Sequence, residues 1–372
     1  MTRKKIILPL LAAVIALSAN AQTDSTKTFV LSGSVDAYTR TDFNNAPSPI
    51  TNNSTSFTNS NNSFELGMAT LRADGSALSG KVLATADLGF GRRADEFSYP
   101  TAGASTTLTP IKQLFVSFTP GKAGSGVKFT IGKWGTHIGY EVLDAYANRN
   151  YSMDYMFSYG PFSHTGIKAE WSHGTWGFMA GVANPTDNAT TTSTTKVAIA
   201  QISDGTKNGK WKFYLNYQGA FGLGGSGSGT EKSFNQFDLV VTGTITSKFS
   251  VGANGTIYTA AYNTVAGGGP TPKATAWGGA AVYLNWDPTS MFGLTLRSED
   301  LINNDHMLMN GATPLSTNIL DETLSANFRV GPVTIIPEVR YESAKDDVYF
   351  KGKDATPTKS DFSGILAAVY KF

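Results

Sequence analysis

Short segments in which apolar and polar residues alternate recur along almost the whole chain. The C-terminal segment shows this clearly, because Phe362, Leu366 and Tyr370 fall on one side of a two-residue repeat while Ser363 and Lys371 fall on the other. Such a repeat is typical of a β-strand with one apolar face. The sequence predicts sixteen strands, at 28–40, 63–73, 80–91, 110–119, 126–134, 164–172, 175–184, 195–203, 210–221, 234–246, 249–261, 274–287, 291–302, 316–330, 333–344 and 361–372.

The connections between these segments alternate strictly between long and short. Short connections, such as 247–248 and 331–332, have two to six residues, whereas long ones, such as 41–62, have ten to 29 and are rich in Asn, Thr, Ser, Gly and Pro. A sandwich with Greek-key crossings gives no reason for this alternation. It predicts an all-β, transmembrane, antiparallel up-and-down barrel with short periplasmic turns and long extracellular loops. Weak alternation in 63–73 and 195–203 leaves a count of fourteen to eighteen strands open.

The first and last strands are expected to pair with each other, because only closure of the barrel removes the two edges of the sheet. The last strand ends on Phe372. A terminal strand that closes on Phe resembles the signal by which bacterial outer-membrane barrels are recognised by their assembly machinery. The expected partners of this chain are therefore that machinery, outer-membrane lipids and lipopolysaccharide.

The N-terminus has the pattern of an export signal. Residues 3–5 are basic, residues 6–17 are apolar, and residues 19–21 read Ala-Asn-Ala, which is typical of a cleavage site. The apolar run is well short of the roughly 20 residues that a membrane-spanning helix needs. The sequence therefore predicts a cleaved signal peptide at 1–21 and a mature barrel at 22–372, located in the outer membrane of a Gram-negative bacterium.

Composition excludes several classes of protein. The 372 residues contain no Cys, so neither a disulfide framework nor a lipid-modified N-terminal Cys can form. Lys and Arg number 30 against 28 Asp and Glu, and they form no basic stripe, which argues against a nucleic-acid partner. Gly, at 39 residues, and aromatic residues, at 12%, favour β structure.

Aromatic residues on the expected lipid face gather beside the short connections or at the C-terminus. An interfacial aromatic girdle belongs there, although aromatic residues are also common at core positions of β-sandwiches. The predicted girdle consists of Phe118, Trp171, Trp211, Trp286, Phe292 and Phe372.

The opposite faces of the strands carry charges of both signs. A barrel of sixteen strands is wide enough to enclose an aqueous channel, which charged side chains tolerate far better than a dry core. Some of these side chains could instead form ion pairs from wall to wall, and either arrangement predicts little ion selectivity. The predicted pore-lining residues are Lys128, Lys212, Arg297, Arg329, Glu338, Arg340 and Glu342.

The longest connection, 135–163, differs from the other loops because it is rich in aromatic and charged residues. A loop of this composition is expected to pack against the barrel rather than extend into solvent. We hypothesise that it folds inward and narrows the pore, with opposed charges that disfavour apolar solutes. The alternative is that the loop seals against the barrel rim and Glu141 is a buried pairing partner. The candidate constriction residues are Lys133, Glu141, Asp144, Arg149 and Asp154.

An ordered motif lies in and around this connection. It runs through Gly-Lys-Trp-Gly-Thr at 132–136, Gly-Tyr-Glu-Val at 139–142, Asn-Tyr-Ser at 150–152 and Phe-Ser-Tyr-Gly-Pro at 157–161, and ends with His-Thr-Gly at 164–166. With this motif the chain resembles the OmpL-like beta-barrel porins of Bacteroidetes. The resemblance implies passive diffusion of small hydrophilic solutes through a water-filled barrel. In that family a basic residue often follows the Tyr-Ser pair, whereas this chain has Met153 and Asp154.

Enzymatic function is not expected. The four histidines are His137, His164, His173 and His306; none is accompanied by a Gly-x-Ser-x-Gly nucleophile motif, and no His-x-x-x-His spacing suggests a zinc site. Neither a metal nor a cofactor is expected. A non-conducting structural or adhesive barrel remains open as an alternative, and an outer-membrane hydrolase is less favoured. The sequence leaves the solute, the oligomeric state and the resting state of the channel undetermined, although large general porins are often trimers.

Overall fold

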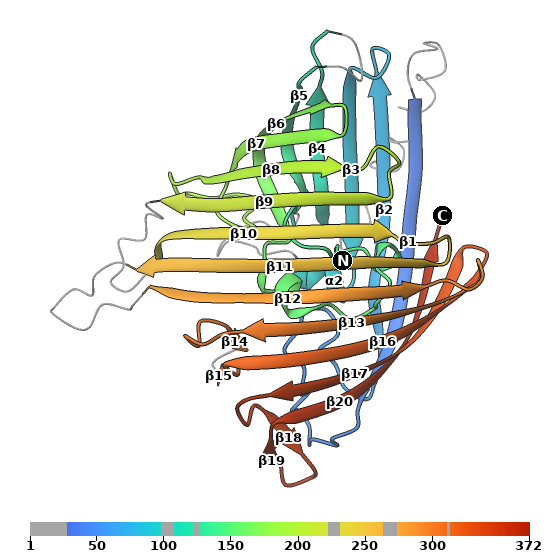
Figure 1. Cartoon of the computed structure of the whole chain (residues 1–372), viewed down its shortest axis with the longest axis vertical. Coiled ribbons are helices and arrows are strands. Elements are labelled where there is room, and N and C mark those ends of the chain that lie inside the picture. Colours follow the sequence, from blue (N-terminus) through green and yellow to red (C-terminus); the bar gives the residue numbers. More distant parts are fainter. Residues whose placement is uncertain (1–27, 98–107, 122–125, 222–230, 263–273, 311–312) are drawn as a thin grey trace, which may run out of the picture.

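The computed structural model describes residues 28–97, 108–121, 126–221, 231–262, 274–310 and 313–372. Within these ranges, sixteen strands form one closed antiparallel barrel in which each strand pairs with its neighbours along the chain (Figure 1). The predicted barrel and the predicted number of strands are confirmed. The signal peptide predicted at 1–21 lies outside the described residues.

The barrel strands agree with the predicted segments to within a few residues. They are β1 (Thr28–Asp42), β2 (Ser63–Ala77), β3 (Val82–Phe90), β4 (Ile111–Phe118), β5 (Lys128–Gly135), β6 (Ser163–His173), β7 (Trp176–Ala183), β8 (Val197–Gly205), β9 (Trp211–Phe221), β10 (Glu231–Thr244), β11 (Phe249–Tyr262), β12 (Thr275–Trp286), β13 (Phe292–Ile302), β16 (Asn318–Val330), β17 (Val333–Ala344) and β20 (Ser360–Lys371). Two small hairpins, β14 (Met309–Asn310) with β15 (Thr313–Pro314) and β18 (Tyr349–Lys351) with β19 (Thr356–Thr358), extend two of the long connections.

The barrel closes between its first and last strands, as the sequence predicts. β1 pairs with β20 from Ser34 opposite Lys371 to Asp42 opposite Ser363. Beyond that ladder, Gly33 and Phe372 exchange two backbone hydrogen bonds of 3.1 and 3.0 Å. The pairing of β1 with β20 therefore closes the sheet. A sheet without free edges is the condition for a barrel to lie in a bilayer.

The strands alternate in exposure as their sequences alternate in polarity. In β17, Val339 and Tyr341 are exposed, whereas Glu338, Arg340 and Glu342 between them are buried. Successive side chains of a strand point to opposite faces, so the apolar residues cover the outside of the barrel and the charged ones its inside.

Pro337 is accommodated by an interruption of the β16–β17 ladder. The pairing runs as far as Ser325 opposite Glu338 and resumes at Phe328 opposite Ile335, so Pro337 has no partner on β16. Proline lacks the N–H that a ladder requires. On the other side, Pro337 stays opposite Leu366 of β20.

Long and short connections lie at opposite ends of the barrel, because each strand reverses the direction of the one before it. We call these the long-loop end and the short-turn end. No helix among the described residues is long and apolar enough to cross a membrane.

Segments from the long-loop end fill part of the interior. They comprise residues 43–62, the helix α2 (Arg92–Phe97) and residues 136–162, which we call the inward loop. Phe57, Arg93 and Tyr155, one from each segment, are at most 1% exposed. Figure 1 shows the green inward loop within the ring of strands. The interior is therefore largely packed, and the inward loop determines the shape of whatever passage remains.

Candidate functional site

The inward loop extends deep into the barrel. It leaves β5 at the long-loop end, yet Arg149 forms an ion pair with Asp287, which follows β12 at the short-turn end. Arg329 of the wall binds the same carboxylate at 2.9 Å. The loop thus runs through most of the length of the lumen before it returns to β6.

Local structure within the inward loop is short. A 3₁₀ turn covers Ala145–Ala147, and the single-turn helix α3 covers Tyr155–Tyr159. Asp154 caps α3 by accepting a hydrogen bond from the N–H of Phe157 at 2.6 Å. Helices this short are not stable alone in water. The conformation of the loop must therefore come from its contacts with the wall.

Two wall carboxylates supply acceptors for the buried backbone of the loop. Glu299 of β13 accepts hydrogen bonds from the N–H groups of Tyr155 and Met156 at 2.7 and 2.8 Å. Glu338 of β17 accepts them from Tyr151 and Ser152 at 2.7 and 3.1 Å. A buried N–H without an acceptor is costly, so these carboxylates position the middle of the loop.

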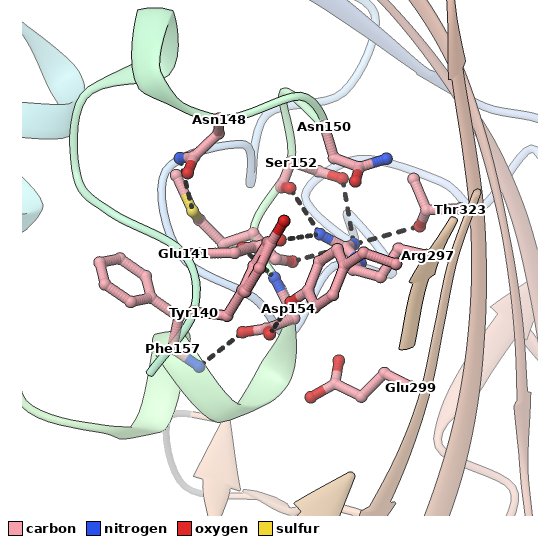
Figure 2. Close-up of polar contacts among 12 residues, drawn as sticks. Tyr140, Glu141, Asn148, Asn150, Ser152, Asp154, Phe157, Arg297, Glu299 and Thr323 are labelled. Atoms are coloured by element: carbon pink, nitrogen blue, oxygen red, sulfur yellow. Dashed lines mark hydrogen bonds and ion pairs between the residues drawn. The ribbon is translucent and has the colours of Figure 1, made fainter. Parts of the chain in front are cut away.

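Arg297 of β13 has no exposed surface and connects the loop to the wall. Its guanidinium group donates to Glu141 at 2.8 Å, to the carbonyl of Ser152 at 2.8 Å and to Asp321 of β16 at 3.1 Å. Figure 2 shows Arg297 extending from the wall among these loop residues, with Thr323 beside it. One buried cation on β13 thereby satisfies groups on the neighbouring strand β16 and on the loop.

The five candidate constriction residues do not converge on one opening. Glu141 and Asp154 are at most 3% exposed, and Asp154 accepts a hydrogen bond from the hydroxyl of Tyr283 at 2.6 Å. Asp144 binds Lys112 at 2.6 Å. Arg149 forms its ion pair with Asp287. Lys133 is buried and donates to the carbonyl of Ile111 at 2.8 Å.

The expectation that Glu141 and Asp154 face water is therefore corrected. Both carboxylates are used to fix the loop, because its buried polar groups need partners inside the barrel. Arg149, by contrast, keeps 33% of its side chain exposed. The contacts of Glu141 agree with the alternative expectation from the sequence, in which Glu141 is a buried pairing partner.

The predicted pore-lining residues divide into two groups. Arg297, Glu338, Arg340 and Glu342 are buried beneath the inward loop or in wall contacts, at most 4% exposed, so the expectation that they line open water is corrected. The others lie toward the short-turn end. Lys128 pairs with Glu170 at 3.0 Å and keeps 39% of its side chain exposed, while Arg329 keeps 30% exposed and Lys212 is exposed.

The six aromatic residues predicted to form a girdle all lie next to short connections or at the C-terminus. Phe118, Trp171, Trp286 and Phe372 are 44–54% exposed. Trp211 and Phe292 are half-buried, and Phe292 packs against Phe328 with ring centroids 5.1 Å apart. The outer surface at the short-turn end therefore carries an aromatic band.

Sequence reasoning missed several anchors of the loop. Lys112 binds both Asp87 and Asp144, and Arg93 of α2 donates to the carbonyls of Leu143 and Tyr151. Lys112 is an inward position of a recognisable strand, so its charge was a signal. Nothing in the sequence indicated that α2 forms or turns inward.

Two of the cavities in the described part of the barrel lie beside strands β3, β5–β10 and β12. The first, of about 410 Å³, lies between the inward loop and strands β8, β9, β10 and β12. The second, of about 500 Å³, lies near the short connections of β3–β8. Gln201 lines both, so the two cavities adjoin.

Two histidines, one in the inward loop and one at the start of β6, lie side by side, and His164 shares a hydrogen bond of 3.1 Å with the hydroxyl of Thr136. The rings of His137 and His164 lie 5.1 Å apart. Burial lowers the pKa of His137 to about 4, so its imidazole is neutral near pH 7. Among the described residues, no three His, Asp or Glu side chains gather where they could hold a metal ion.

Asp187, in the long connection between β7 and β8, anchors the end of the inward loop. Its Oδ1 accepts hydrogen bonds from the N–H groups of Phe162 and Ser163, both at 2.7 Å. Burial raises the pKa of this carboxyl to about 7, although the two N–H donors and Lys133 act in the opposite direction.

The stability of this anchor is expected to fall as the pH rises from about 4 to 7. Over that range the folded protein holds a proton on Asp187 that the unfolded chain has released, so the contribution is complete below about pH 4 and is lost as the pH rises through about 7. One proton limits the slope to about 1.4 kcal/mol per pH unit. Denaturant unfolding between pH 4 and 8 measures it. D187N should flatten the profile, and equal slopes for both proteins would refute the assignment.

Comparison with known proteins agrees with this architecture. The family described as "Putative beta-barrel porin-2, OmpL-like" matches residues 28–372. The fold is similar to that of the anion-selective porin from Comamonas acidovorans, with a TM-score of 0.60, 10% identity and coverage of 93% of this chain and 100% of that one.

Two further solved structures share the fold. Pseudomonas putida OprB has a TM-score of 0.57 and 10% identity, with 98% of this chain and 97% of that chain covered. OmpT of Vibrio cholerae has a TM-score of 0.55 and 12% identity, with 94% and 99% covered. None of the curated proteins compared with this chain matches it.

Proposed function

The chain belongs to the beta-barrel porin-2, OmpL-like family, and from this premise we propose that it is an outer-membrane porin for the passive diffusion of small hydrophilic solutes. The observation that carries the proposal is the closed sixteen-strand barrel with an apolar outside and a polar inside. The solved porins of similar fold support it.

Within this function, the inward loop acts as the constriction. Arg149 and the wall residues Lys128, Lys212 and Arg329 keep exposed surface. The carboxylates of Glu170 and Asp287, 30% and 26% exposed, lie beside them, so a solute would meet charges of both signs. Because most charged side chains inside the barrel are already paired, the channel should select little between small anions and cations.

The orientation follows from the two ends of the barrel. Short turns face the periplasm and long loops face the outside, with the aromatic band at the periplasmic boundary of the membrane. We further propose that residues 1–21 are removed on export and that the strand ending at Phe372 is read by the assembly machinery. OmpT of Vibrio cholerae is described in a trimer form, which supports a homo-oligomer here.

A non-conducting structural or adhesive barrel is the second candidate. The packed loop favours it, because Tyr151, Met153, Asp154 and Tyr155 have no exposed surface. An enzyme is not proposed, because the family and the solved porins of similar fold support a channel.

Planar-bilayer recording separates the two candidates. The purified mature protein is expected to insert with discrete, stable conductance steps of nearly equal size for KCl and for potassium salts of larger anions, corrected for mobility. Heat-unfolded protein serves as the control. Insertion without any conductance would refute the porin function and favour the structural barrel.

A further inference from the structure

The first cavity has the properties of a solute-binding site. We propose that it binds an uncharged polyhydroxylated solute of mono- or disaccharide size, an inference that rests on the proposed porin function. Its volume of about 410 Å³ falls in the range of small-molecule sites. It lies beside the inward loop, which extends through the lumen, so a solute passing through would encounter it.

The cavity lies on the short-turn half of the barrel. Tyr214 is the fourth residue of β9, which begins after a short connection, and Thr242 is two residues from the end of β10. Asn285 is the second-last residue of β12. The second cavity adjoins at Gln201 and extends toward the short turns. Solute would therefore reach the site most directly from that end.

The lining is rich in hydrogen-bonding groups without charge. Amide side chains come from both the loop and the wall. Several of them are held by bonds within the protein, since Gln201 donates to Asn216 and Asn216 donates to Asp238, both at 2.8 Å. The hydroxyls of Tyr214 and Thr242 make no hydrogen bond within the described part of the chain, and neither is closed off from the cavity. The amides are Asn148, Asn150, Gln201, Asn216 and Asn285.

The charged groups at the cavity either form ion pairs within the protein or carry no charge. Glu141 pairs with Arg297, Arg149 shares Asp287 with Arg329, and His137 is neutral near pH 7. An ion entering the cavity would lose hydration without gaining a free opposite charge. A solute that offers hydroxyls and no charge loses less hydration free energy on entering, and its hydroxyls can form hydrogen bonds with those of Tyr214 and Thr242.

The geometry thus favours sugars over ions, and calorimetric titration of the full mature protein in detergent tests this. Maltose and sucrose are expected to bind saturably, and gluconate and glucosamine, which carry opposite charges, are expected to bind at least about tenfold more weakly. Thr242→Val, which removes one hydroxyl, should weaken sugar binding about fivefold, and Tyr214→Ala about tenfold. Tyr217→Phe, on the outward face of β9, is the matched control and should leave the affinity for sugar unchanged.

Each outcome bears on the proposal. Absence of saturable sugar binding, equal binding of the charged analogues, or unchanged affinity in both cavity variants would overturn it. Circular dichroism and heat-modifiable gel mobility check that the Tyr214→Ala protein folds. If that protein does not fold, the near-isosteric Thr242→Val protein provides the test. Conductance without sugar binding would count against this site alone, whereas sugar binding without conductance would count against the porin function.

Discussion

Replacing Arg297 with methionine is expected to cost about 3–5 kcal/mol of unfolding free energy, because it leaves the buried carboxylate of Glu141 without its counter-charge and leaves Asp321 with Arg340 alone. Glu141 and Asp321 are 3% and 0% exposed, and both bind this guanidinium group. The carbonyl of Ser152 loses its donor as well. Since the same group ties the loop to the wall, channel conductance should rise. Denaturant unfolding in detergent and single-channel recording measure the two effects.

Arg329→Met is the matched control for this experiment. Arg329 also faces the lumen, but its side chain is 30% exposed and its partner Asp287 keeps Arg149. Exposed pairs contribute little, so the control should lose less than about 1 kcal/mol. Equal losses in the two variants, or an unchanged conductance for Arg297→Met, would contradict the assignment of Arg297 as the connection between loop and wall.

The barrel itself could be predicted from the sequence because its information is local. A two-residue repeat fixes which side chains of a strand face lipid, and the alternation of long and short connections fixes the up-and-down order. The closing pair of β1 and β20 follows from the same argument, since a barrel has no free edge. Even Pro337, which the alternation placed in a paired strand, needed only a local break in one ladder.

The interior could not be predicted in the same way, because its contacts join residues far apart in the chain. The charges at Glu299 and Glu338 were visible as inward positions, yet nothing near them shows that their partners are backbone N–H groups of residues 151–156. Composition indicated that the loop packs against something. It did not indicate that residues 43–62 and α2 pack beside it.

A charged residue at an inward position of the wall can therefore have either of two roles, and the alternation of polarity does not distinguish them. It can face water in a channel, as Lys212 does at the short-turn end, or it can hold a loop, as Arg297 does. Depth along the strand distinguishes them in this protein. The exposed charges lie near the short turns, where Lys128 begins β5 and Arg329 is second-last in β16, whereas the buried ones lie farther from those turns.

Glu338→Gln is expected to release the middle of the inward loop and to cost about 2–4 kcal/mol. The two carboxylate oxygens accept three hydrogen bonds, from the N–H groups of Tyr151 and Ser152 and from the hydroxyl of Ser325 at 2.7 Å. Glutamine keeps one acceptor and presents an NH₂ group to the remaining donors, so at least one buried N–H is left unpaired at about 1–3 kcal/mol. Loss of the charge weakens the bonds that remain.

The variant should also show that the carboxylate acts on the loop rather than on the barrel. Residues 150–153 are then expected to become accessible to solvent, and the noise of the single-channel current should increase. A single Cys placed at Ser152 should react with a thiol reagent only when Glu338 is also replaced. The natural chain has no Cys, so the readout is free of background. Glu322→Gln on the outward face of β16 is the control, because its side chain bonds only to Ser298 among the described residues. Labelling at Ser152 that is equally fast with Glu338 intact would mean that the loop is already open, and the assignment of Glu338 as its anchor would fail.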